Sequence, residues 1–133
     1  MRSKDMKSKK NRRNFARYGV GSLRVSLHHT RLLGLISDLI DVTPIDFNAT
    51  GMAFRHSQLL SPGQPVVFEL SKDQHRASLV VGIVRYTTRM ENHYRCGVEF
   101  DFEANQHMRS PHIRDMLRSI ENLLRKVVIL SGS

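Results

Sequence analysis

The sequence predicts an all-β fold with a C-terminal helix: a six-stranded antiparallel β-barrel preceded by a flexible basic N-terminal arm. Three observations lead to this prediction. Six short segments have the residue patterns of β-strands and are separated by turn signals, with no helical period between them. The apolar spacing changes to that of a helix only after residue 110. The first 17 residues are strongly basic and contain few apolar side chains.

The strand segments are recognised by alternation and by turn residues. Residues 22–29 place apolar side chains at 23, 25 and 27 and polar ones between them, which is the period of a half-buried strand. The stretch from Leu32 to Phe47 is rich in Leu, Ile and Val, and its Pro44 predicts a strand that is bulged there or ends at an edge. The remaining segments are a short strand at 51–54, a proline–glycine turn at 61–64, strands at 66–70 and 77–86 joined by a polar turn at 71–74, and a last alternating strand at 94–102.

The end of the chain has the spacing of a helix. Ser110 followed by Pro111 is a helix-start signal, because proline fits the first helical position without losing a hydrogen bond. Apolar residues then recur at steps of three and four: Ile113, Met116, Leu117, Ile120, Leu123, Leu124 and Val127. We therefore expect a helix at about 110–130 that closes an open end of the barrel or meets a partner. Residues 22–133 form one domain in this prediction, and residues 1–21 form the arm and a glycine-containing hinge.

The positive charge is concentrated in the arm. Residues 1–17 hold eight basic side chains and one acidic one, a net charge of +7, whereas the rest of the chain contributes only +2 to the total of +9. Such a segment cannot bury enough apolar surface to order itself, so we expect it to be mobile until an anion binds it. A solubilising tail is the simpler interpretation of a basic arm with no other feature.

The amino-acid composition limits the classes of protein to which this chain can belong. A chain of 133 residues with 40% apolar residues suits one soluble domain. The sequence contains no apolar run of membrane-spanning length and no apolar N-terminal stretch typical of a signal peptide, so a cytoplasmic location without membrane insertion is expected. The single Cys96 has no cysteine partner and alternates within a strand like a core thiol. We predict that the protein is not an enzyme, because the sequence offers no evident pair of nucleophile and general base. We also predict no metal site, because the seven histidines are not spaced like the ligands of one metal ion.

Two short motifs stand out in this architecture. Arg13 and Arg17 form an R-x-x-x-R pattern where the arm joins the body, and Asp46, Asn48 and Gly51 follow in "DFNATG" at a predicted turn between strands. The arginine pattern alone has little meaning, because it recurs at residues 85/89 and 114/118, where we assign no ligand role.

Taken together, "RNFAR", "DFNATGMAF" and "CGVEF" in this order resemble the PilZ family of cyclic di-GMP receptors over roughly residues 12 to 103. The resemblance implies a PilZ-type barrel and a site formed by Arg13, Arg17, Asp46, Asn48 and Gly51. Asn48 stands where the family usually has serine. A basic residue at the position of Arg12, by the same resemblance, favours a stacked dimer of the ligand.

The chemistry of these residue types suits that ligand. A guanidinium can form two parallel hydrogen bonds with a guanine edge or a phosphate, which suits Arg13 and Arg17. The carboxylate of Asp46 can accept from the N1–H and N2–H groups of guanine. Gly51 allows either a turn with positive φ or a close approach of the ligand. We expect the ligand to draw the arm onto the barrel while the C-terminal helix stays in place, creating a surface for an unidentified protein effector.

Other interpretations remain open. Asp46 and Asn48 also fit turn residues that bond their own backbone, and the arginines fit solvated charges. A PilZ-like adaptor that binds only protein is one alternative function. A small basic barrel that binds single-stranded nucleic acid is another, which the nearly neutral body and the absence of Trp disfavour.

Overall fold

The computed structural model describes residues 20–30 and 37–132 of the chain. The predicted arm therefore lies almost wholly outside the described residues, and Arg12, Arg13 and Arg17 lie outside them as well. The start of the predicted second strand, at residues 32–36, is likewise outside the described ranges.

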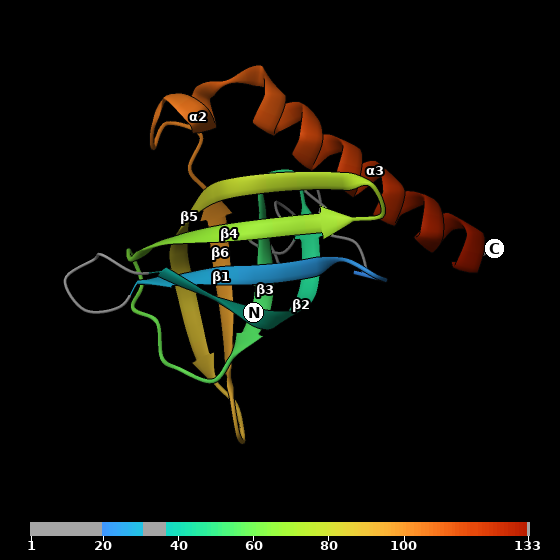
Figure 1. The fold of residues 1–133 in the computed structure, drawn as a ribbon. Coiled ribbons are helices and arrows are strands. Elements are labelled where there is room, and N and C mark those ends of the chain that lie inside the picture. The colour runs from blue at the N-terminus through green and yellow to red at the C-terminus, as the bar shows by residue number, and fades with distance from the viewer. Residues whose placement is uncertain (1–19, 31–36, 133) are drawn as a thin grey trace, which may run out of the picture.

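Within these ranges the chain forms six strands that close into a barrel, followed by two helices (Figure 1). The elements are β1 (Arg24–Thr30), β2 (Ser37–Asn48), β3 (Gly51–His56), β4 (Pro65–Lys72), β5 (His75–Arg89), β6 (Tyr94–Phe100), α2 (Gln106–Arg109) and α3 (Pro111–Gly132). The strand order around the barrel is β1-β2-β3-β6-β5-β4, with β4 paired back to β1, and every pair is antiparallel. The predicted six-stranded antiparallel barrel with a C-terminal helix is confirmed.

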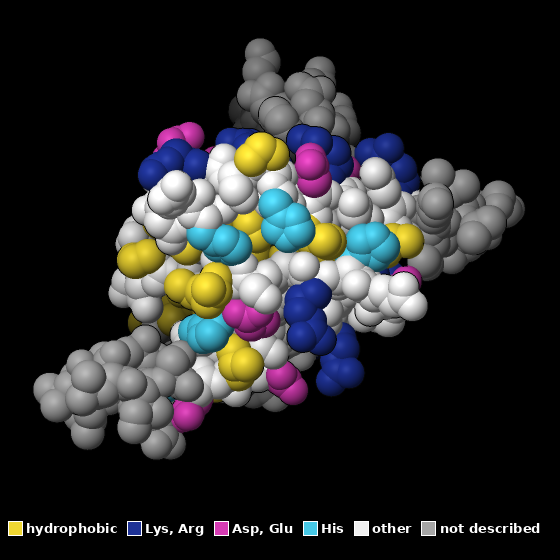
Figure 2. Space-filling model, turned by 45° about the horizontal axis from the view of Figure 1, so that its top comes forward, with side chains coloured by type: hydrophobic (Ala, Val, Ile, Leu, Met, Phe, Trp, Pro, Cys, Tyr) yellow, Lys and Arg dark blue, Asp and Glu magenta, His cyan; other side chains and the backbone are white. Residues whose placement is uncertain are grey.

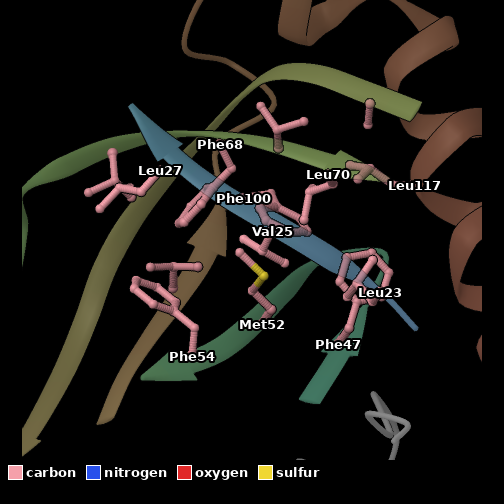
Figure 3. Close-up of a cluster of buried hydrophobic side chains, with 14 of the residues drawn as sticks. Leu23, Val25, Leu27, Phe47, Met52, Phe54, Phe68, Leu70, Phe100 and Leu117 are labelled. Carbon is pink, nitrogen blue, oxygen red and sulfur yellow. The ribbon is translucent and has the colours of Figure 1, made fainter. Parts of the chain in front are cut away.

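The core fills the barrel with side chains that alternate along the strands. In β4, Val66, Phe68 and Leu70 are buried while the residues between them are partly exposed. The ring of Phe68 meets Phe54 of β3 edge to face, with centroids 5.4 Å apart. Figure 3 shows the inward side chains of several strands meeting in one cluster, to which α3 contributes Leu117. Each large apolar side chain buried in this way contributes about 1.5–3 kcal/mol to folding.

Bulges bend three strand pairs where the barrel curves. The β2–β3 register shifts between Pro44 and Asp46, which confirms the predicted bulge at this proline. Proline has no N–H to donate, so a regular ladder cannot continue through it. The bulge determines that Asp46 lies opposite Ala53 of β3. Further register shifts occur in the β4–β5 and β5–β6 pairs.

The β4–β5 hairpin is tighter and longer than the sequence analysis expected. Its loop contains only Asp73 and Gln74, and Asp73 has a positive φ of 55°. Two-residue hairpin loops favour such φ values, because they match the twist of the flanking strands. As a result β5 begins at His75 and continues to Arg89, beyond both predicted ends.

Helix α3 begins at Pro111, as predicted, and packs on the barrel. Its residues Ile113, Leu117, Ile120 and Leu124 are buried and belong to the same core cluster as the strands. It contacts β5, β2 and β4 as well as α2, so it packs against the barrel. No helix within the described residues combines the length and apolarity required to cross a membrane.

Candidate functional site

The turn between β2 and β3 is held together by the side chain of Asn48. Its Oδ1 accepts hydrogen bonds from the backbone N–H of Thr50 at 2.8 Å and of Gly51 at 3.0 Å, and from the Thr50 hydroxyl at 2.8 Å. Asn48 is only 4% exposed. The structure therefore gives this residue the turn-forming role that the sequence analysis kept as an alternative.

Gly51 is required by the barrel itself. A Cβ atom at this position would lie 2.4 Å from the carbonyl oxygen of Val98 on the neighbouring strand β6. Its φ is not in the left-handed region, so the expectation of a turn with positive φ at Gly51 is wrong. The close approach that needs a glycine here is that of the backbone of β6, because β3 and β6 pair at this point.

Asp46 points its carboxylate to the outside of the barrel beside this turn. One oxygen accepts the backbone N–H of Ala53 at 3.1 Å, and the other lies 3.6 Å from Nη2 of Arg95. The side chain is 26% exposed and that of Arg95 is 38% exposed. An ion pair this long and partly exposed contributes little by itself.

Two rows of residues form the outer face next to Asp46. The first row crosses the strands as Asp46, Ala53, Gly97 and Tyr86 in β2, β3, β6 and β5. Ala53 and Gly97 are small and buried, and a Cβ on Gly97 would lie 2.0 Å from the ring of Tyr86. The Tyr86 ring thus packs against the backbone at Gly97, and Tyr86 is 39% exposed.

The second row adds positive charge. Arg55 of β3 and Arg95 of β6 are direct cross-strand partners, flanked by Thr43 of β2 and Thr88 of β5. Like charges directly opposite each other destabilise a sheet, and an anion bound between them relieves the repulsion. We name Asp46, Arg55, Tyr86, Arg95 and Gly97 together the outer-face site.

Sequence reasoning did not identify Arg55, Tyr86 or Arg95. Alternation does place Arg55 and Arg95 outward, because Arg55 follows buried Phe54 and Arg95 precedes buried Cys96. Strict alternation from buried Val84 would place Tyr86 inward, and the register shift between these two residues turns it outward. Their proximity depends on the register between strands far apart in the chain, which alternation does not give.

The root of the arm lies beside α3. The described chain begins with a turn in which Leu23 N–H donates to the carbonyl of Val20 at 2.7 Å, and Gly21 has a φ of 47°. A turn with a glycine in the left-handed region therefore lies within the predicted hinge. A Cβ on Gly21 would lie 3.9 Å from Leu124 of α3. Arg17 is only three residues before Val20, a reach of at most about 10 Å.

Three of the four arginines in the other two R-x-x-x-R patterns have local partners. Arg85 donates to Glu99 at 2.8 Å on the outer surface of the barrel. Arg114 lies over the ring of Phe102 at 4.1 Å, and Arg118 is 3.5 Å from Asp115. These contacts account for Arg85, Arg114 and Arg118 without a ligand.

The described residues contain no group of three or more His, Cys, Asp and Glu side chains that could hold a metal ion. Figure 2 shows histidine side chains spread over one face among hydrophobic and polar ones. Cys96 is buried, and desolvation raises the pKa of its thiol, an effect that a hydrogen bond with Thr87 only partly opposes. A thiol in this state is a poor nucleophile.

The geometry defines a small closed β-barrel with a charged outer-face site, and a basic arm precedes its first strand. The model of the PilZ domain family matches residues 11–118, most of the chain, so the chain belongs to the PilZ domain family. Among solved structures, the chain is similar to the "PilZ domain with c-di-GMP of YcgR from Escherichia coli", with a TM-score of 0.61 and 15% identity over 89% of this chain and 95% of that chain. Comparison with curated proteins gives no match.

Proposed function

We propose that the protein is a cyclic di-GMP receptor without enzymatic activity, and that the ligand binds between the arm and the outer-face site. The observation that carries this proposal is the outward carboxylate of Asp46 beside the cross-strand pair of Arg55 and Arg95. Membership of the PilZ family supports it, as does the similarity to the PilZ domain with c-di-GMP of YcgR.

The charges suit both parts of the ligand. Asp46 accepts from the N1–H and N2–H groups of one guanine, which requires its Oδ2 to leave Arg95. Arg55 and Arg95 then face a phosphate, and the exposed ring of Tyr86 offers an apolar surface for a base. Arg13 and Arg17 of the arm contact the ligand from the opposite side. Asn48 and Gly51 contribute by fixing the turn that positions Asp46.

In this proposal the arm converts ligand binding into a change of the protein's surface. Ligand binding brings the +7 arm onto the barrel, and the ordered arm with the adjoining barrel face forms a surface that an effector protein recognises. Arg12, next to the first arginine of the motif, favours binding of the ligand as a stacked dimer.

Calorimetric titration tests the proposal, with cyclic di-AMP, GMP and GTP as competing ligands. Cyclic di-GMP should bind in preference to all three. GMP and GTP each present one guanine to a site matched to two, and adenine carries a donor where guanine has the O6 acceptor. Asp46→Ala and Arg95→Ala should each weaken binding by about 1–3 kcal/mol, the scale of a good base contact. Arg118→Ala is the matched control, since it removes an exposed arginine of another R-x-x-x-R pattern. Equal binding of the adenine and guanine dinucleotides contradicts the proposal, and the absence of binding favours the protein-only adaptor.

A further inference from the structure

The β2–β3 turn is tied to the C-terminal helix by one hydrogen bond. The backbone N–H of Ala49 donates to Oε1 of Glu121 in α3 at 2.8 Å, across 72 residues of sequence. The next two backbone donors, Thr50 and Gly51, are bound by Asn48. Three successive N–H groups of the turn are therefore held by two side chains from different elements.

Glu121 is itself fixed in place. Its side chain is 17% exposed, and its second oxygen lies 3.3 Å from Nη2 of Arg125 one helical turn later. The neighbouring residues Ile120 and Leu124 are buried in the barrel core. A hydrogen bond from an amide to a partly desolvated carboxylate is stronger than one between neutral groups. Movement of the turn therefore acts directly on a docked segment of α3.

The same segment of α3 also lies close to the hinge. A Cβ on Gly21, the point where the arm leaves the barrel, would lie 3.9 Å from Leu124. Residues 121–125 of the helix thus contact the β2–β3 turn, called the ligand turn below, through Glu121, and they approach the root of the arm through Leu124. A ligand that bridges the arm and the β2–β3 turn therefore affects both contacts of the helix at once. In this way α3 takes part in binding although it carries none of the motif residues.

We infer that Glu121 is a positioning residue for the ligand turn, and that it couples ligand binding to the docking of α3. This inference rests on the proposed function. With Glu121 present, the turn is held in the arrangement that binds the ligand, and the ligand in turn stabilises the docked helix. Linkage requires both effects to have the same magnitude.

If Glu121 instead competed with the ligand, its removal would change the affinity in the opposite direction. The Glu121 carboxylate would then occupy an N–H group that a ligand phosphate needs, and removing it would strengthen ligand binding. The burial of Glu121 and its pairing with Arg125 favour the positioning role. Displacing the carboxylate would break the ion pair with Arg125 and leave the Ala49 N–H without its acceptor, and both losses cost free energy.

The experiment compares three variants of the full-length chain. Glu121→Ala removes the acceptor, Glu121→Gln keeps an oxygen for Ala49 N–H without the charge, and Asp115→Ala removes an exposed acidic residue of the same helix that pairs with Arg118. Cyclic di-GMP affinity is measured by calorimetry. Amide hydrogen exchange is followed at residues 49–51 and 117–125, with and without the ligand.

Glu121→Ala should weaken cyclic di-GMP binding about fivefold, the loss of one net hydrogen bond of ~1 kcal/mol, while Glu121→Gln and Asp115→Ala stay within about twofold of wild type. The ligand should slow exchange at 117–125 in wild type and in Glu121→Gln but not in Glu121→Ala, a difference that a purely structural role does not produce. Unchanged or tighter binding by Glu121→Ala overturns the inference.

Failure of the proposed function is recognised separately. If wild type binds no cyclic di-GMP, that function is wrong, and the coupling is judged by exchange without ligand. Faster exchange at both 49–51 and 117–125 in Glu121→Ala, restored in Glu121→Gln, supports the coupling. Faster exchange at neither segment, or at one alone, overturns it.

Discussion

Replacement of Asn48 by alanine tests whether this residue holds the ligand turn. The change removes three hydrogen bonds to Oδ1, from Thr50 N–H, the Thr50 hydroxyl and Gly51 N–H. Each bond is worth about 1 kcal/mol net, and a buried donor that loses its acceptor costs about 1–3 kcal/mol. Since the bond to Gly51 is buried and those to Thr50 are partly buried, we expect a total loss of about 3 kcal/mol.

Urea denaturation followed by circular dichroism measures this loss directly. Thr50→Val is the matched control, because it removes only the hydroxyl donor and should cost at most about 1 kcal/mol. Asn48→Ser keeps an acceptor at shorter reach, so this variant should lose less unfolding free energy than Asn48→Ala. Its cyclic di-GMP binding should be retained. If Asn48→Ala unfolds at the same urea concentration as wild type, the amide does not hold the turn.

Three further predictions concern the arm and the core. Arg13→Ala or Arg17→Ala should each cost at least about 1–3 kcal/mol of cyclic di-GMP binding without changing thermal stability, and an unchanged Kd would move the site elsewhere. Amide exchange at residues 10–21 should slow when the ligand binds; equal rates in both states would contradict ordering of the arm. Burial, together with the charge of His29, lowers the pKa of His56 below its ordinary 6.5. The unfolded chain therefore takes up that proton at higher pH than the folded protein, so stability should fall as pH drops below about 6.5 and level off below the folded-state pKa. His56→Gln should flatten this dependence in urea titrations at pH 7 and pH 5; an identical pH dependence would exclude His56 as its source.

Local pattern was sufficient for most of the fold. The alternation in residues 22–29 assigned Leu23, Val25 and Leu27 to the core, where the structure buries them. Pro44 marked the bulge, because a missing N–H interrupts a ladder wherever the strand lies. The Ser110–Pro111 pair marked the start of α3 for an equally local reason.

The site depended on contacts that local pattern does not contain. The motif placed Asp46, Asn48 and Gly51 at one turn, but the reason for a glycine at 51 is a carbonyl of β6. The pairing of Arg55 with Arg95 needs the β3–β6 register, which joins strands separated by two others in the chain. Nothing in the apolar stripe of the helix distinguished Glu121 from other solvent-facing residues of α3.

The position of Tyr86 on Gly97 offers a way to observe the molecule without labels. The chain contains three tyrosines and no tryptophan, so its ultraviolet emission has no indole background. Tyr86→Trp would place a single indole on an exposed strand surface, in the row that begins at Asp46. Emission from that one ring would then report directly on whatever covers this side of the barrel, at concentrations and on timescales that calorimetry does not reach.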